Sequence, residues 1–277
     1  MLDRRIVRKL LRSAFKEDIG FGDITTTAVL TGEETGAASA LAKSEIVVAG
    51  IDVFREAFFY IDRQIQFTGG SVDGQSAVKG EILAAVSGPL HSILIAERVA
   101  LNFFQRMCGI ATLTRQYVDQ VRGTHAKILD TRKTVPGLRY LDKYAVRIGG
   151  GANHRFGLCD GVLIKDNHIA AAGGISRALA RVHDRIPHTL KVEIEVKNLH
   201  ELEEALSAGA DVIMLDNMTI EEMQKAVSLV NGRVPLEASG NVNLTNVKQI
   251  AETGVDFISV GRLTHSAPAA DISLKIE

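Results

Sequence analysis

The sequence predicts an α/β protein: an incomplete, open α/β barrel of about six parallel strands, preceded by an N-terminal α+β sandwich domain. Two observations predict this fold. In the second half of the chain, short apolar runs alternate with segments of helical periodicity, as expected for βα units around a parallel sheet. In the first half, helical patterns flank strand-like segments without that regular alternation, which indicates a separate domain.

The predicted barrel strands are short runs rich in β-branched or large aliphatic residues. Such runs are typical of strands that are buried on both faces of a sheet. They cover residues 127–129, 161–164, 190–194, 212–215, 234–236 and 257–260.

Helical patterns lie between the later strands. Apolar residues recur at helical spacing in segments 175–182, 199–206, 223–230 and 247–251. The last four apolar runs follow one another at intervals of roughly 21 residues, a tight spacing that favours a closed or nearly closed barrel over an open doubly wound sheet. Because six runs are present instead of the eight of a complete barrel, an incomplete barrel is predicted.

The first half of the chain has a different pattern. It predicts an amphipathic helix over residues 2–15, strand-like segments at 38–51 and 82–86, an apolar helix near 53–60 and a long helix from about 92 to 121. We therefore expect two domains. The division is 1–110 for the N-terminal α+β domain and 111–266 for the open barrel with the active site, and the C-terminal tail 267–277 could join the first domain.

Length and composition exclude several classes of partner. The chain has 277 residues, a formal net charge of −1 and a pI near 6.7, so it lacks the basic character of a general nucleic-acid or membrane-surface binder. No stretch reaches the roughly 18 to 20 apolar residues of a membrane span. The charged start leads into an amphipathic pattern and not into a signal-peptide core. We expect a cytoplasmic protein that binds neither nucleic acid nor membranes.

Positive charge is concentrated between Lys127 and Lys165, where eight Lys and Arg residues stand against three Asp residues. Glycines and apolar residues interrupt the charges, so the segment lacks a smooth helical period. Arginine has a planar fork that matches carboxylates and phosphates, and lysine adds a mobile positive charge. Many charge runs are only solvated faces. This one, however, predicts a loop region that lines a pocket for a small, highly anionic ligand.

Charged or glycine-containing segments follow the predicted strands. In barrels, ligands bind where the carboxyl ends of the strands meet, so charges at successive strand ends are expected to share one rim. The loops at 239–241 and 259–261 lie where barrels often hold a phosphate. The charged residues expected at the rim are Arg132, Lys133, Lys165, Glu195, Asp216 and Glu237.

Motifs along nearly the whole chain resemble those of the quinolinate phosphoribosyltransferases, a family of type II phosphoribosyltransferases. Cys108 stands where a serine is more usual in that family, a departure that affects no catalytic position. The matching motifs lie at residues 17–20, 22–25, 97–98, 101–102, 109–112, 130–139, 143–146, 149–155, 164–168, 193–195, 208–211, 214–217, 237–240 and 263–266.

The resemblance implies an enzyme of NAD biosynthesis. The implied reaction joins quinolinate to the phosphoribosyl group of phosphoribosyl pyrophosphate (PRPP) and gives nicotinate mononucleotide, pyrophosphate and CO2, with Mg2+ as the cofactor. Both small-molecule substrates are strongly anionic, which is compatible with the basic segment. Mg2+ prefers oxygen ligands together with substrate phosphates, which is compatible with acids at the rim.

The resemblance also implies roles for single residues. Lys133, Glu195 and Asp216 resemble the phosphoribosyl and metal–pyrophosphate set and are the catalytic candidates. Glu195 and Asp216 would hold Mg2+ either directly or through pyrophosphate and water. The residues that resemble the quinolinate-contacting set are Arg98, Arg132, His154, Arg155 and Lys165.

The remaining substrate-binding candidates concern the phosphate and the neighbouring subunit. Arg98 belongs to the first domain and enters the site of a neighbouring subunit in the family, so a head-to-tail homodimer is implied. Thr131 and Arg262 complete the substrate-binding set. The residues that resemble the family's 5′-phosphate cradle are Ser239, Gly240, Asn241, Val260 and Gly261.

Three alternatives stay open. A molybdenum-transport-associated paralogue of the same family would share the fold, but the intact set of Arg98, Arg132, His154, Arg155 and Lys165 favours quinolinate. Lys165 at a strand end could be the Schiff-base lysine of an aldolase-type barrel, although such an enzyme has no use for the first domain. A non-catalytic ligand sensor would not need paired acids beside a phosphate cradle.

Overall fold

The computed structural model describes residues 2–277, and contacts divide the chain into two compact units. The first unit holds the described part of Met1–Arg115, together with Val135–Gly150 and Ser266–Glu277. The second unit holds Gln116–Thr134 and Gly151–His265. The division into 1–110 and 111–266 stays a prediction about domains.

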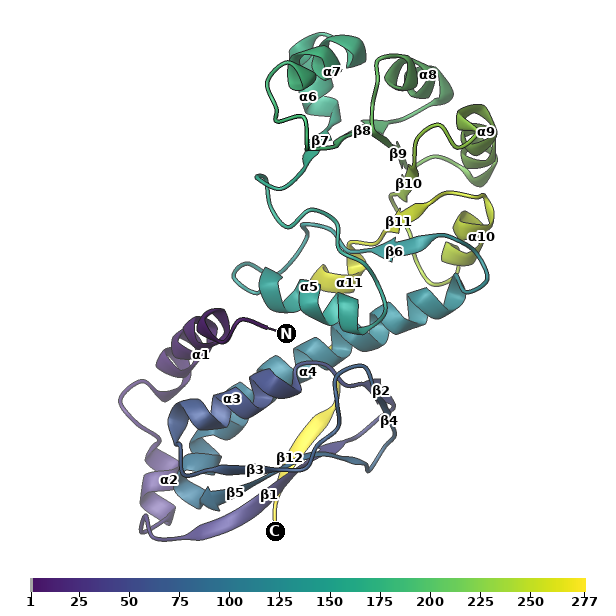
Figure 1. Ribbon diagram of the computed structural model, residues 1–277. Coiled ribbons are helices and arrows are strands. Elements are labelled where there is room, and N and C mark those ends of the chain that lie inside the picture. Colours follow the sequence, from purple (N-terminus) through teal and green to yellow (C-terminus); the bar gives the residue numbers. More distant parts are fainter. Residues whose placement is uncertain (1) are drawn as a thin grey trace. The chain divides into compact units, whose positions relative to one another are not determined.

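The second unit is built on a six-stranded parallel sheet with the order β6-β11-β10-β9-β8-β7. The strands form an arc with helices on its outer side (Figure 1). Among the described residues no ladder joins β6 to β7, so the sheet is open and the predicted incomplete barrel of six strands is confirmed. The strands are β6 (Lys127–Leu129), β7 (Val162–Ile164), β8 (Val192–Val196), β9 (Val212–Asp216), β10 (Leu236–Ser239) and β11 (Phe257–Ser259).

The helices of this unit bury the apolar faces that the sequence predicts, as with Leu202 and Ala205 of α8. Side chains cap the beginnings of two helices. Asn198 accepts a hydrogen bond from the backbone N–H of Glu201, and Thr219 forms a capping box with Glu222, which satisfies backbone donors that a helix start leaves exposed. The helices are α6 (Asp166–Ala172), α7 (Ile175–His183), α8 (Leu199–Ser207), α9 (Ile220–Val230), α10 (Val247–Glu252) and α11 (Arg262–His265).

Two strands begin two residues later than the apolar runs predict. β8 begins at Val192 and not at residue 190, and β10 begins at Leu236 and not at residue 234. Pro235 lacks the N–H that a ladder needs, and β10 starts directly after it. The shift matters for the site, because Glu195 and Glu237 lie inside strands and not in the segments that follow them.

The first unit contains an antiparallel sheet with the order β12-β1-β5-β3 and a separate two-stranded sheet, β2-β4. The expected strand-like segment 38–51 is split into two strands by a short connection. The strands are β1 (Thr35–Ala42), β2 (Ile46–Val47), β3 (Gln66–Thr68), β4 (Ser76–Ala77), β5 (Ile82–Pro89) and β12 (Ile272–Ile276), the last of which pairs with β1.

Aromatic contacts join the helices of the first unit. The Phe15 and Tyr60 rings stack with centroids 5.4 Å apart, and the Phe54 and Phe104 centroids are 4.9 Å apart. Asp23 accepts a hydrogen bond from the backbone N–H of Thr26 and so caps α2, in line with a capping role. The helices are α1 (Arg4–Ile19), α2 (Ile24–Val29), α3 (Ile51–Ile61), α4 (Leu90–Gln120) and α5 (Arg139–Ile148). The end of α4, from Gln116 on, belongs to the second unit.

Helix α5 corrects the prediction that the whole basic segment is a loop region around one pocket. Its residues Arg139, Lys143 and Arg147 belong to the first unit, and Lys143 is buried. Arg106 donates to both carboxylate oxygens of the fully buried Asp142, at 2.8 and 2.7 Å. This part of the positive charge therefore lies on a helix of the first unit and does not line the pocket. Separately, no helix in the described chain is both long and apolar enough to cross a membrane.

Candidate active site

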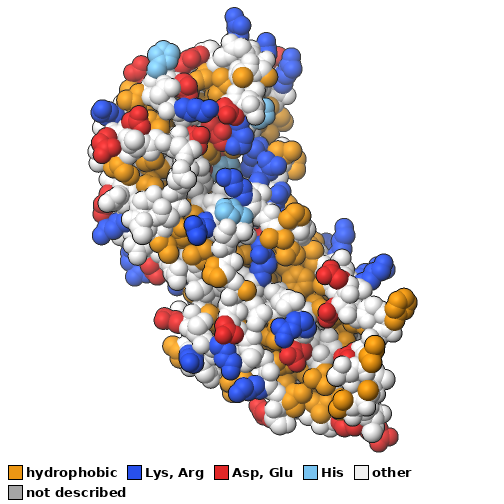
Figure 2. Space-filling view, turned by 180° about the vertical axis from the view of Figure 1, so that it is seen from behind, with side chains coloured by type: hydrophobic (Ala, Val, Ile, Leu, Met, Phe, Trp, Pro, Cys, Tyr) orange, Lys and Arg blue, Asp and Glu red, His pale blue; other side chains and the backbone are white. Residues whose placement is uncertain are grey.

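A cavity of about 560 Å³ opens at the carboxyl ends of the strands of the second unit. In Figure 2, Lys and Arg side chains gather around a recess in the upper half of the view. The lining brings together eleven predicted site residues, namely Thr131, Arg132, Lys133, His154, Arg155, Lys165, Glu195, Asp216, Ser239, Gly240 and Asn241. The other lining residues are Leu163, Met214, Asn217, Glu237 and Ser259.

Three predicted residues of the last loop do not line this cavity. Val260 is buried and donates its backbone N–H to the Leu129 carbonyl, and Arg262 is exposed at the start of α11. Gly261 lies against Lys133: a Cβ atom at residue 261 would be 3.0 Å from Lys133 Cδ. Their part in a phosphate cradle stays a prediction.

Cations line the cavity close to one another. Lys165 follows β7, and its Nζ forms an ion pair with Glu195 of β8. Arg155 donates from Nη1 to the Gly161 carbonyl at 2.9 Å. Burial and the nearby positive charge of Arg132 lower the pKa of Arg155. Two guanidinium groups that repel each other in a cavity favour an anionic ligand, because an anion between them removes the repulsion.

Polar side chains link the ends of β9 and β10. Asn217 donates from Nδ2 to Asp216 Oδ1 at 2.9 Å and accepts at Oδ1 from Asn241 Nδ2 at 3.0 Å. Gly240 has φ +97°, and a Cβ atom there would lie 2.2 Å from Asn217 Oδ1. Only glycine fits both the backbone conformation and the space. The result is a tight, polar turn with a carboxylate at its edge, a shape suited to a phosphate group and its counter-ion.

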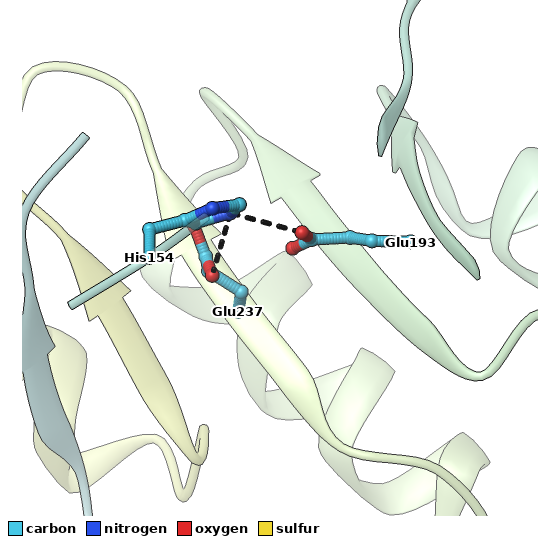
Figure 3. A group of neighbouring side chains, drawn as sticks. All are labelled: His154, Glu193 and Glu237. Atoms are coloured by element: carbon cyan, nitrogen blue, oxygen red, sulfur yellow. Dashed lines mark ion pairs between the residues drawn. The ribbon is translucent and has the colours of Figure 1, made fainter. Parts of the chain in front are cut away.

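Two of the cavity-lining side chains, His154 and Glu237, lie beside the buried Glu193 (Figure 3). His154 Nε2 lies 2.9 Å from Glu193 Oε2 and 3.7 Å from Glu237 Oε2. Glu193 and Glu237 are only 8% and 2% exposed. Burial and the neighbouring Glu193 carboxylate raise the pKa of Glu237 to about 8.

The hydrogen bonds of His154 decide between a metal site and a proton-sharing site for this group. Its Nδ1 accepts the backbone N–H of Arg155 at 2.7 Å, so the ring hydrogen lies on Nε2. That N–H points at Glu193 and leaves no lone pair on Nε2 for a metal ion. The three side chains therefore form a proton-sharing group, although their ligand atoms lie within 4.8 Å of one another.

Asn217 and Glu193 were not among the predicted site residues. The sequence does contain a signal for Glu193. Side chains alternate between the two faces of a strand, so Glu193 and Glu195 of the segment Val192–Val196 lie on the same face. Glu195 was placed at the rim, so the same face should have placed Glu193 below it. Asn217 has no comparable signal beyond its position next to Asp216, because its role depends on the turn of another strand.

Arg98 lies on α4 in the first unit. The Arg98 side chain is 59% exposed, and its Nη2 lies 4.0 Å from Glu97 Oε1. An exposed pair at that distance contributes little. Its role in a neighbouring subunit stays a prediction.

Comparisons with known proteins identify the family of this chain. Residues 110–275 match the family described as quinolinate phosphoribosyl transferase, C-terminal domain, and residues 23–108 match its N-terminal domain. The probable nicotinate-nucleotide pyrophosphorylase (carboxylating) of Bacillus subtilis (strain 168) is 44% identical over 270 residues, which cover 98% of this chain and 93% of the relative. A quinolinate phosphoribosyltransferase (decarboxylating) of Nicotiana tabacum, 1b, is 44% identical over 98% of this chain and 82% of its own length.

The fold agrees as well. The structure of the nicotinate-nucleotide pyrophosphorylase from Francisella tularensis matches with a TM-score of 0.96 and 42% identity over 100% of this chain and 98% of that chain. The two family models together, the alignment with the Bacillus subtilis relative and the structural match each cover nearly the whole chain. The chain belongs to the quinolinate phosphoribosyltransferase family.

Proposed function

We propose that this protein transfers the phosphoribosyl group of PRPP to quinolinate and releases nicotinate mononucleotide, pyrophosphate and CO2, a step of NAD biosynthesis. One observation carries the proposal: three cations and two acids line the same cavity. They are Arg132, Arg155, Lys165, Glu195 and Asp216. Relatives that share 43–44% of the sequence over nearly the whole chain are named for this activity.

The reaction uses the two kinds of charge in different ways. Breaking the bond from ribose to pyrophosphate develops positive charge on the sugar, which the carboxylates of Glu195 and Asp216 stabilise. The leaving pyrophosphate gains negative charge, which Lys133 at the cavity edge neutralises. Arg132 and Arg155 hold the quinolinate carboxylate that the product retains, for which a guanidinium fork is well shaped.

The proposal includes Mg2+ as the cofactor. The donor atoms at the cavity edge are carboxylate oxygens of Asp216 and Glu195, and they fit an ion that prefers oxygen ligands together with substrate phosphates. When bound, Mg2+ would neutralise charge on the pyrophosphate. Asp216 keeps Oδ2 for such a role, because its hydrogen bond from Asn217 uses Oδ1.

The ion pair between Lys165 and Glu195 bears on the Schiff-base alternative. An amine nucleophile must be uncharged, and a carboxylate partner stabilises the charged ammonium instead. Lys165 is therefore better suited to binding a carboxylate. The head-to-tail homodimer with Arg98 in the neighbouring site and the cytoplasmic location both stay predictions.

The test is an assay of the purified protein with quinolinate, PRPP and Mg2+ in which pyrophosphate, CO2 and nicotinate mononucleotide are all measured. We expect the three products in equal amounts, with none formed when either substrate is left out. Nicotinate in place of quinolinate serves as the control substrate, since it lacks the carboxylate that leaves. Absence of pyrophosphate release with quinolinate would reject the proposed function.

A further inference from the structure

The second half of the proposed reaction requires a proton. When CO2 leaves the pyridine ring, the ring carbon keeps the electron pair of the broken bond and must gain a hydrogen. The cations that line the cavity are poor sources. Guanidinium groups do not release protons in proteins, the Lys165 ammonium is held by Glu195, and Lys133 is assigned above to the leaving pyrophosphate. A neutral acid in the same cavity is the chemically suitable donor.

Glu237 has the surroundings of a neutral acid. Its side chain lines the cavity yet is only 2% exposed, and its Oε1 has no hydrogen-bond partner among the described residues. The N–H of His154 lies closer to Glu193 than to Glu237, at 2.9 against 3.7 Å. Glu193 therefore accepts that hydrogen bond. Two buried carboxylates this close do not both ionise, and Glu237 is the one that keeps its proton.

The position of Glu237 in the strand places it below the cations. It lies two residues before Ser239, the last residue of β10, which corresponds to roughly 6–7 Å along a strand. Arg132 and Lys165 come from segments that follow β6 and β7. A flat aromatic acid that these cations hold at the mouth of the barrel therefore has the Glu237 carboxyl group beneath it.

We propose that Glu237 is the acid that protonates the pyridine carbon from which CO2 leaves, an inference that rests on the proposed function. The bond between that ring carbon and the carboxylate carbon breaks, and its electron pair stays on the ring beside the alkylated nitrogen. The Glu237 O–H bond breaks, and its proton forms the new C–H bond. Glu237 is left as a carboxylate and regains a proton from solvent before the next turnover.

A neutral acid has a second advantage at this position. A guanidinium or ammonium group paired with the departing carboxylate stabilises it as an anion and so opposes its loss. A protonated carboxyl group supplies the hydrogen without a countercharge. The adjacent carboxylate of the substrate, which is retained in the product, remains available to Arg132 and Arg155. The cavity can thus hold one carboxylate firmly and release the other.

The test uses single turnovers of the full-length protein with quinolinate, PRPP and Mg2+, in which pyrophosphate and CO2 are followed separately. For Glu237→Gln we expect pyrophosphate release within about threefold of wild type but CO2 release slowed by about 100-fold or more, the usual contribution of a general acid. The carboxylated mononucleotide should accumulate and be visible by mass spectrometry. In Glu237→Asp, which restores a carboxyl group, CO2 release should recover in part.

Met214→Leu is the matched control, because Met214 also lines the cavity and is 4% exposed but carries no acid. Whatever its turnover, its CO2 and pyrophosphate should appear together. Equal release of both products by Glu237→Gln, at the wild-type rate or at one common reduced rate, would overturn the inference. If Glu237→Gln does not fold, Glu237→Asp decides: a lag of CO2 behind pyrophosphate supports the proposal, and its absence overturns it. Failure of the wild-type protein to release pyrophosphate would instead reject the proposed function itself.

Discussion

Arg132 lies three residues after the end of β6 and lines the cavity with Arg155, whose pKa it helps to lower. We expect Arg132→Ala to abolish quinolinate binding while the fold stays intact, because loss of one partner of a charged contact in a largely desolvated site costs about 2–5 kcal/mol. Calorimetric titration with quinolinate measures the effect. Arg122→Ala is the control, since the Arg122 side chain is 80% exposed on the surface of the same unit. Unchanged quinolinate affinity in Arg132→Ala would contradict the assignment.

Gly240 allows the turn that joins the ends of β9 and β10. In Gly240→Ala the new Cβ atom would meet Asn217 Oδ1 at 2.2 Å, at a backbone φ of +97°. We expect the KM for PRPP to rise at least tenfold, because Asn217 must move and the turn that faces the phosphate must shift. Gly232→Ala is the matched control: its φ is also positive, at +71°, but no atom lies within 4 Å of the new Cβ. Both variants should lose about 1–2 kcal/mol of stability, and only Gly240→Ala should change the KM.

Single residues also show what the sequence could predict. Arg132, Lys165 and Asp216 follow or end short apolar strands, so their shared position at the barrel mouth could be inferred from order alone. Arg139 and Lys143 carry the same charge but belong to helix α5. Charge density does not distinguish the two groups. The apolar spacing of Leu141 and Ala145 was the only local sign of the helix.

At the scale of elements, strands β8 and β9 are neighbours in the sheet and present Glu195 and Asp216 at the cavity. We expect the double variant Glu195→Gln with Asp216→Asn to lose turnover strongly, because both negative charges near the ribose and the metal–pyrophosphate are removed. Quinolinate should still bind. Steady-state rates against Mg2+ concentration, together with quinolinate calorimetry, provide the check. A double variant with full Mg2+-dependent activity would show that these acids have another role.

The strand boundaries explain why the inner acids were misplaced. The predicted apolar runs ended before Glu195 and before Glu237, so β8 and β10 were placed two residues too early. In an enzyme barrel, however, the inward-facing positions near the carboxyl ends are the site itself. Glu193, Glu195 and Glu237 replace core residues there. The predicted order and number of strands are nevertheless correct, because the outward-facing and deeper positions of the strands are apolar.

For the molecule as a whole, Glu237 makes stability depend on pH. Its pKa is about 8 in the folded protein against an ordinary value of 4.5, so the folded state binds this proton more tightly than the unfolded chain. The resulting stabilisation is fully present below the unfolded pKa and is lost as pH rises through about 8. Glu237→Gln removes this dependence. Its free energy of unfolding relative to wild type should therefore increase from about pH 5 to pH 8 and then level off. Urea denaturation across this range measures the difference, and a constant difference would contradict the expected titration.

The predicted role of Arg98 would make activity depend on assembly. Arg98 lies in the first unit, whereas the cavity is lined entirely by residues of the second. If Arg98 completes the site of a neighbouring subunit, Arg98→Ala and Lys165→Ala chains should each be inactive alone. A mixed dimer would then contain one wholly wild-type site, formed by the Lys165 of one chain and the Arg98 of the other. With random exchange about half of the dimers are mixed, so roughly a quarter of wild-type activity should return.

The matched control for this experiment mixes Lys165→Ala with Arg132→Ala. Both residues line the same cavity of one chain, so every site in every dimer would lack one of them, and no activity should return. Subunit exchange can be followed independently by native mass spectrometry of differently tagged chains. If exchange is complete and the Arg98→Ala mixture stays as inactive as this control, Arg98 acts within its own chain or outside the reaction. Recovery near a quarter in one mixture and none in the other would require Arg98 to serve the partner's site, because no arrangement confined to one chain produces that contrast.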